Sequence, residues 1–264
     1  MRPGLCLFAL ILASTVALGS RLVGAVDISS DTTISTANTN TQQNFTANNV
    51  TLTINADTTG RTNNGISVDG GISGASVIIG TGVTVSVTNN QAIDGTGSTN
   101  LSVINSGTLS AVAKTIELEG SASGAVITNN FGGTITATNN AIKTENNTSN
   151  VTINNSGLIS TTNIGHAIAT ATGTDSGMII NNFSTGVIVK TSTADAAQEA
   201  IELGDSGVIT NSGQIRNDTS PSNTSIRLKG DNSTLTLQGG GVVVGRIVSE
   251  GTGNKLQVNH GLGQ

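Results

Sequence analysis

Short stretches in which apolar and polar residues alternate recur along the chain, and each begins with an isoleucine. They begin at Ile66, Ile93, Ile116, Ile142, Ile168, Ile201 and Ile226. Successive isoleucines are 27, 23, 26, 26, 33 and 25 residues apart, a mean of about 27. Alternation with a period of two predicts strands that bury one face. A period near 27 residues predicts that these strands belong to stacked repeats.

A second pattern lies between these stretches and combines apolar residues, asparagine and a glycine two residues before a closing apolar residue. It occupies residues 103–109, 126–135, 153–159, 179–188 and 208–215. We interpret its Gly and Asn residues as the turn residues at the corners of each coil, because both adopt left-handed backbone conformations at low cost. Each repeat is therefore predicted to contain two or three short strands joined by tight turns.

The two patterns together predict an all-β fold, a right-handed parallel β-helix (solenoid) of roughly seven or eight coils of about 27 residues. One coil has too narrow an apolar face to form a core, whereas stacked coils place isoleucine on isoleucine and give every strand parallel partners. A disordered tract would not keep this spacing over 160 residues. A β-sandwich would need aromatic residues between its sheets, and the chain has four Phe, no Trp and no Tyr.

The chain divides into four segments on this interpretation. Residues 1–25 are a signal peptide, residues 26–60 an N-terminal cap and first coil, and residues 61–230 the regular coils. Residues 231–264 are rich in Gly and Val and form the last coils, with an open end. Because an open parallel edge favours aggregation, we expect a further segment to follow this end.

The N-terminal segment has the features of an export signal. Arg2 precedes an apolar run from Leu5 to Leu18, too short for the roughly 20 residues that span a bilayer, and we expect cleavage after Ala25. Cys6, the only cysteine, lies in the removed segment, so the mature chain can form no disulfide or thiolate metal site.

Composition and charge narrow the function further. Without Arg2 and Arg21 the chain holds nine basic and sixteen acidic residues, a net charge near −7. Basic residues are too sparse for a nucleic-acid track, and no later apolar run is long enough to cross a membrane as a helix. We find no motif that predicts a cofactor or a metal-ligand cluster. We therefore expect no nucleic-acid partner, no transmembrane segment in the mature chain and no cofactor.

The residues one and three positions after each isoleucine should point outward and concentrate much of the charge on one face. The residues singled out on this face are Asp94, Glu117, Glu119, Lys143 and Glu145. The interpretation we favour is a solvated strand whose charges keep the rod soluble and block lateral sheet pairing. The alternative is a Ca²⁺ site or a pair of acids for sugar cleavage.

The chain contains two histidines, which are further candidates for a catalytic role. His166 precedes an isoleucine stretch at a corner, and His260 lies near the C-terminal end. Ser and Asp are so abundant that their spacing identifies no catalytic triad, and we assign no catalytic residue.

The Asn-Ser-Gly-x-Ile turns, the x-Ala-Ile strands and the run from Gly230 to Leu237, followed by Gly-rich and Val-rich coils, resemble autotransporter passenger domains. These are secreted β-helices of Gram-negative bacteria, and the resemblance covers nearly all of residues 26–260. It implies export and display or release at the outer surface, often for adhesion. Members of that family end in a membrane β-barrel that this sequence lacks. We therefore expect either a barrel encoded downstream or a stand-alone secreted solenoid.

The predicted function is a non-catalytic cell-surface, outer membrane-associated or extracellular β-helix that serves as a stalk or adhesive surface. The expected partners are host or cell-surface glycans or proteins. The alternative is a polysaccharide lyase or hydrolase that uses the acidic face. Such an enzyme would need aromatic side chains on which sugar rings stack, and the chain has no Trp or Tyr.

Overall fold

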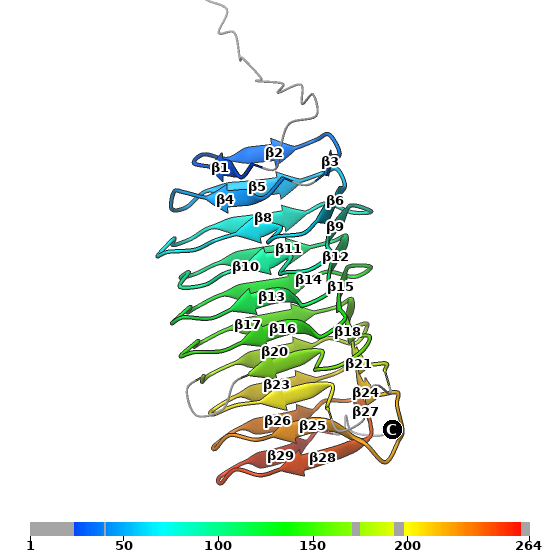
Figure 1. Ribbon diagram of the computed structural model, residues 1–264. Helices are drawn as coiled ribbons and strands as arrows, with labels where there is room; N and C mark the ends of the chain where they lie inside the picture. The colour runs from blue at the N-terminus through cyan, green and yellow to red at the C-terminus, as the bar shows by residue number, and fades with distance from the viewer. Residues whose placement is uncertain (1–23, 40, 171–174, 193–197, 260–264) are drawn as a thin grey trace, which may run out of the picture.

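A computed structural model describes residues 24–39, 41–170, 175–192 and 198–259, and all regular secondary structure within these ranges is β-strand. The strands form three parallel sheets that stack along one axis as a β-helix, with the N-terminal strands at one end and the C-terminal strands at the other (Figure 1). Most of the predicted signal peptide and His260 lie outside the described residues. Within these ranges, no helix has the length and apolar character needed to cross a membrane.

Sheet 1 contains the strands that begin with or include the predicted isoleucines. Its ten strands, in spatial order, are β1 (Val26–Ile28), β4 (Gln43–Phe45), β7 (Ile66–Ser67), β10 (Ile93–Asp94), β13 (Lys114–Leu118), β16 (Asn140–Thr144), β19 (Ile168–Thr170), β22 (Ile201–Leu203), β25 (Thr224–Leu228) and β28 (Arg246–Ser249).

Sheets 2 and 3 complete each coil. Sheet 2 consists of β2 (Thr32–Ile34), β5 (Thr51–Ile54), β8 (Ser76–Ile79), β11 (Ser102–Asn105), β14 (Val126–Asn129), β17 (Thr152–Asn155), β20 (Ile179–Asn182), β23 (Val208–Asn211), β26 (Thr234–Leu237) and β29 (Lys255–Val258). Sheet 3 consists of β3 (Asn38–Thr39), β6 (Thr58–Arg61), β9 (Thr84–Val87), β12 (Thr108–Ala111), β15 (Thr134–Ala137), β18 (Leu158–Thr161), β21 (Val187–Lys190), β24 (Gln214–Asn217) and β27 (Val242–Val244). We call one strand from each sheet, taken in succession, a rung.

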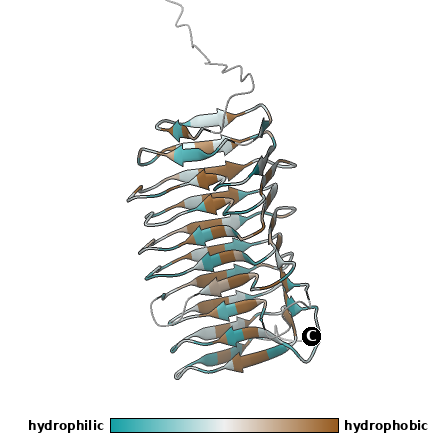
Figure 2. Ribbon diagram, viewed as in Figure 1, coloured by the Kyte–Doolittle hydropathy of each residue, from teal (hydrophilic) through white to brown (hydrophobic). Residues whose placement is uncertain are grey.

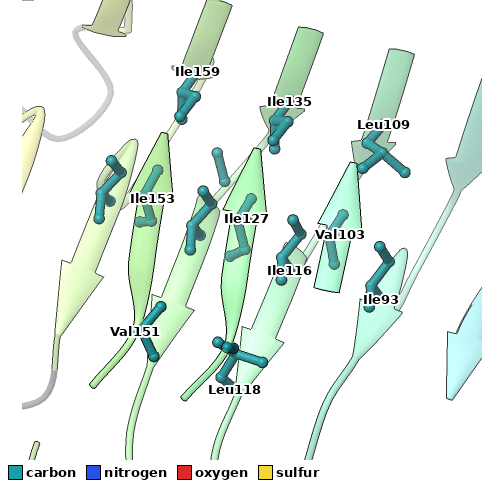
Figure 3. Packing of buried hydrophobic residues seen from close by; sticks show 14 of the residues in the cluster. Ile93, Val103, Leu109, Ile116, Leu118, Ile127, Ile135, Val151, Ile153 and Ile159 are labelled. Atoms are coloured by element: carbon teal, nitrogen blue, oxygen red, sulfur yellow. The ribbon is translucent and has the colours of Figure 1, made fainter. Parts of the chain in front are cut away.

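The isoleucines stack directly on one another, as the sequence predicts. Ile93 pairs in register with Ile66 on one side and Ile116 on the other, and the column continues through Ile142 and Ile168. These side chains are fully buried (Figure 3). Burying an aliphatic side chain of this size contributes about 1.5–3 kcal/mol. The column therefore holds the stack of about eight regular turns together without aromatic rings or disulfides.

A ladder of buried asparagines runs beside the apolar core at the end of the sheet 2 strands. Each side-chain amide donates to the side-chain carbonyl of the next rung, from Asn105 to Asn129 (2.9 Å), to Asn155 (2.9 Å), to Asn182 (2.8 Å) and to Asn211 (2.8 Å). The predicted left-handed conformation is wrong for these residues, because none has a positive φ angle. They are buried because every amide group finds a partner.

The glycine of the same turns also has a different role from the predicted one. Gly157 does not have a positive φ angle. A Cβ atom there would instead clash with the carbonyl oxygens of Gly133 and Asn130 in the preceding rung. Glycine is required at this corner because the backbones of successive rungs approach too closely for any side chain.

Left-handed residues occur in the four-residue turns after β8, β14 and β26, at Gly82, Gly132 and Gly240, and also at the start of the sheet 2 strands. At the start of these strands they alternate between Asn and Gly over six successive rungs. Positive φ angles occur at Asn49, Gly74, Asn100, Gly124, Asn150 and Gly177. The turns from sheet 2 to sheet 3 alternate as well, with four residues after β8, β14 and β20 and two after β11, β17 and β23. The packing repeat is therefore two rungs, twice the period of the isoleucines.

Long polar side chains occupy inward positions at the end of sheet 3. Arg61 pairs in register with the core residue Val87 yet is buried, and Lys190 is fully buried at an equivalent position several rungs on. Arg61 Nη1 donates to the Gly65 carbonyl, and Lys190 Nζ donates to the Asn163 carbonyl at 3.0 Å. Both cations thus satisfy backbone carbonyls in the turn that leads to sheet 1.

Hydrophilic and hydrophobic residues are mixed in the strands at both ends of the described rod (Figure 2). Residues 26–60, predicted as a cap and one coil, contain strands of two short rungs, β1–β3 and β4–β6. At the other end, β27, β28 and β29 are the edge strands of the three sheets, and large apolar side chains there are exposed. These are Val242, Val244, Ile247, Leu256 and Val258.

Candidate functional site

The outer face of sheet 1 carries a continuous row of polar side chains, which we call the polar ladder. Because strand residues alternate sides, the positions two before, one after and three after each isoleucine face away from the core. The ladder includes the five predicted residues, Asp94, Glu117, Glu119, Lys143 and Glu145, and also Asn64, Gln91, Lys114, His166, Glu199, Glu202, Arg227 and Lys229.

The structure brings Glu117, Glu119 and Glu145 together around two lysines, and we call this group the acidic cluster. One carboxylate oxygen from each glutamate lies within 4.8 Å of the others. Lys114 Nζ contacts Glu117 Oε1 and lies 2.7 Å from Glu145 Oε1, and Lys143 Nζ lies 3.0 Å from Glu145 Oε2. The ammonium group of Lys114 thus bridges the carboxylates of Glu117 and Glu145.

Two carboxyl groups of the acidic cluster have opposite proton affinities. Burial, together with the neighbouring Glu145, raises the pKa of Glu117. The pKa of Glu145 falls to about 2, because burial, which would raise it, is outweighed by hydrogen bonds with Glu117, Lys114 and Lys143. Two adjacent acids with separated pKa values are the arrangement that acid–base chemistry uses.

Asp94, the predicted acidic residue outside the acidic cluster, accepts hydrogen bonds from uncharged side chains, and so does Glu119. Asp94 accepts hydrogen bonds from Asn64 Nδ2 at 2.6 Å and Thr96 Oγ1 at 2.7 Å. Glu119 accepts from Thr96 Oγ1 at 3.4 Å and from Asn146 Nδ2 at 3.2 Å. Except for the Thr96–Asp94 bond, which lies within one rung, these contacts cross from rung to rung and connect neighbouring coils.

The favoured interpretation of this face as a fully solvated strand needs correction at Glu117, whose exposure is only 2%. Its two oxygens accept from Lys114 and from Gln91 of the preceding rung, and these two side chains help to cover it. Glu117 and Lys143 of the next rung lie in register. Lys143 nevertheless forms its ion pair with Glu145.

A second charged group, which the sequence analysis did not identify, surrounds His166. His166 Nδ1 lies 3.4 Å from Glu199 Oε2, and one ligand atom from each of His166, Glu199 and Glu202 lies within 4.8 Å of the others. Arg227 binds Glu199 Oε1 through Nε at 2.6 Å and also contacts Glu250 at 2.6 Å. Glu199 is almost completely buried, and burial raises its pKa.

The position two residues before each isoleucine was not assigned to this face by the sequence analysis. That position holds Asn64, Gln91, Lys114, His166 and Glu199. From this position a side chain reaches the residue that follows the isoleucine in the next rung. Asn64 reaches Asp94, Gln91 reaches Glu117, and Glu199 reaches Arg227. The signal was therefore present in the sequence, as complementary polar residues about 26–30 positions apart.

A cavity of about 320 Å³ lies beside the first rungs, lined in part by Gln42, Arg61 and Asn64. Burial lowers the pKa of Arg61 to about 10. Its guanidinium Nε and Nη2 atoms are buried and make no hydrogen bond within the described residues. The cavity reaches the polar ladder at Asn64 but lies two rungs from the acidic cluster.

The chain matches no protein-family model, no curated protein and no solved structure.

Proposed function

We propose that the protein is a non-catalytic β-helix of the cell surface or the extracellular space, similar to an autotransporter passenger domain, that serves as a stalk or adhesive surface. The observation that carries this proposal is a set of three kinds of contact that join neighbouring rungs. Isoleucines, asparagines and charged pairs each connect one rung to the next. An extended body with such connections resists bending, and it presents its long outer faces to a partner.

The adhesive part of the proposal rests on apolar side chains that face solvent on alternate rungs. Phe131 and Phe183 lie in the four-residue turns after β14 and β20 and are 79% and 47% exposed. Val126 and Ile179, at the starts of the same two strands, are also exposed. Exposed aromatic and aliphatic groups of this kind mark contact surfaces for proteins or for the apolar faces of sugars.

The proposal is tested by binding of the purified chain to cells, extracellular matrix proteins and glycan arrays. Replacing Phe131 and Phe183 with Ala should reduce binding at least about tenfold, because exposed aromatic anchors dominate interface energies. The control is Ile164→Ala, which removes a comparably exposed apolar group at a different corner. Binding that is equal in the two variants would contradict an adhesive role for this face.

The opposite pKa shifts of Glu117 and Glu145 support a second candidate, a polysaccharide-active enzyme that uses the acidic cluster. Its test is sugar release from plant and host glycans before and after Glu117→Gln and Glu119→Gln replacement. Release that disappears while the melting temperature is retained would favour the enzyme over the stalk. We regard the enzyme as less well supported, because both oxygens of Glu117 already accept from Lys114 and Gln91.

Export to the surface is part of the same proposal and rests on the N-terminal apolar segment. Fractionation of cells that express the full chain, with N-terminal sequencing of the product, tests it. A mature chain that begins at Val26 outside the cytoplasm is expected. An uncleaved chain retained in the cytoplasm would contradict it.

A further inference from the structure

We propose that His166, Glu199 and Glu202 form a binding site for a divalent transition-metal ion of the zinc class. The three residues come from two neighbouring rungs. His166 lies two residues before the first residue of β19, whereas Glu199 and Glu202 lie on either side of Ile201 of β22, which pairs in register with β19. The register of sheet 1 therefore brings the imidazole of one rung beside the two carboxylates of the next.

The spacing of the candidate ligand atoms fits a small metal ion. His166 Nδ1 and Glu199 Oε2 are 3.4 Å apart. Two ligands of a tetrahedral zinc centre, with bonds near 2.0–2.2 Å, are separated by about 3.4 Å. Glu202 offers a carboxylate oxygen to the same group, in which one ligand atom from each of the three residues lies within 4.8 Å of the others. A small rotation of its side chain would complete the set of three protein ligands.

The histidine nitrogen that faces the carboxylates has no other role. His166 is only 9% exposed, and its buried Nδ1 makes no hydrogen bond in the part of the chain that the structure describes. A buried polar atom without a partner costs about 1–3 kcal/mol.

Arg227 positions the buried carboxylate for this role. Of the two Glu199 oxygens, Arg227 contacts only Oε1, through Nε at 2.6 Å and through Nη2, and so leaves Oε2 directed at His166. A ligand carboxylate held by a second residue in this way is typical of metal sites. Lys229 Nζ lies 3.4 Å from Glu202 Oε1 and competes weakly for that oxygen.

The surrounding cations limit the affinity and select the metal. Lys143 and Lys190 act on His166 electrostatically, and Arg227 and Lys229 contact the two glutamates. These positive charges disfavour ions such as Ca²⁺ that are held by charge and oxygen ligands alone. An ion with affinity for imidazole nitrogen is favoured instead. The acidic cluster has no nitrogen ligand, which is why we do not place the ion there.

The test uses the full chain, freed of metal by chelator, titrated with Zn²⁺ alone in a calorimeter. One bound ion per chain is expected, and Co²⁺ should give the visible absorption of a tetrahedral site. His166→Ala and Glu202→Gln should each weaken binding at least about tenfold. Lys229→Gln should strengthen binding, because it frees an oxygen of Glu202 and removes a positive charge.

His260→Ala is the matched control, because His260 is the only other histidine of the chain. Binding that is absent in the wild type, or that survives His166→Ala and disappears with His260→Ala, would overturn the proposal. Circular dichroism melting confirms that each variant is folded. Glu202→Gln changes a partly exposed side chain, so it tests the site even if His166→Ala fails to fold.

Discussion

The buried asparagine ladder offers a sharp test of what holds the rungs together, through the replacement Asn155→Ala. Asn155 Nδ2 donates to Asn182 Oδ1 at 2.8 Å, and Asn155 Oδ1 accepts from Asn129 Nδ2 at 2.9 Å and from the Gly157 N–H at 3.2 Å. The φ angle of Asn155 is not positive. Alanine therefore introduces no backbone strain, and its effect comes from the lost hydrogen bonds.

The magnitude follows from which groups lose their partners. Asn129 Nδ2 keeps the carbonyls of Gly133 at 3.2 Å and Leu158 at 3.1 Å. Asn182 Oδ1 and the Gly157 N–H lose the partner that Asn155 supplies. A buried polar group left without a partner costs about 1–3 kcal/mol. Two such groups lower the free energy of unfolding by about 2–6 kcal/mol.

The neighbouring residue supplies the control. Asn154 lies on the same strand but faces outward, and its Oδ1 accepts one half-buried hydrogen bond, from Asn181 Nδ2 at 2.9 Å. Asn154→Ala has the same change in strand propensity and should cost only about 0.5–1.5 kcal/mol. Urea unfolding followed by circular dichroism measures both variants, with the midpoint shift interpreted at constant slope. Equal midpoint shifts in the two variants would refute the reasoning.

Three further predictions concern the core, the charges and the corners. Ile116→Ala should lower the free energy of unfolding by about 2–5 kcal/mol. Ile104→Ala, which changes a half-buried side chain, should lower it by less than about 1 kcal/mol. Urea unfolding measures both variants, and similar midpoint shifts would contradict the stacked core. Because the pKa of Glu145 is lowered from 4.5 to about 2, its stabilising contribution is present above pH 4.5 and lost as the pH falls toward 2. Thermal melts should show a steeper loss over this interval than in Glu145→Gln, and parallel curves would argue against the ion pairs. Asn150 has a φ angle of 54°, so the Asn150→Gly variant should be about 1 kcal/mol more stable to unfolding than Asn150→Ala. The reverse order of stability in denaturant unfolding would exclude a left-handed corner.

The isoleucine positions could be predicted from the sequence because the requirement they meet is local and repeated. Each rung from β7 to β25 has an isoleucine at the same place, so Ile93, Ile116 and Ile142 stand 23 and 26 residues apart. The parallel pairing and the coil length follow from that spacing. A regular alternation of apolar and polar residues thus determines the fold without any information on distant contacts.

The environments of polar residues could not be predicted in the same way. Glu117 and Lys190 occupy positions that look solvent-exposed or apolar by alternation, yet both side chains are buried. Glu117 is covered by Gln91 of the preceding rung, and Lys190 reaches the carbonyl of Asn163 around a corner. These contacts depend on side-chain reach between rungs, which the pattern within a single strand does not contain.

The alternation of Asn and Gly at the left-handed corner explains why the packing repeat is two rungs rather than one. A Cβ atom at Gly124 would lie 2.6 Å from Asn100 Oδ1, and one at Gly177 would lie 2.9 Å from Asn150 Oδ1. An asparagine side chain therefore occupies the space above the next rung, and only glycine fits beneath it. The rung after that has no side chain above it and can hold asparagine again. From Asn49 to Gly177, steric exclusion between neighbours thus doubles the period that the hydrophobic core alone would impose. Beyond Gly177 the left-handed position holds Ser206, whose side chain is shorter than that of asparagine, and Asn232 occupies it in the next rung.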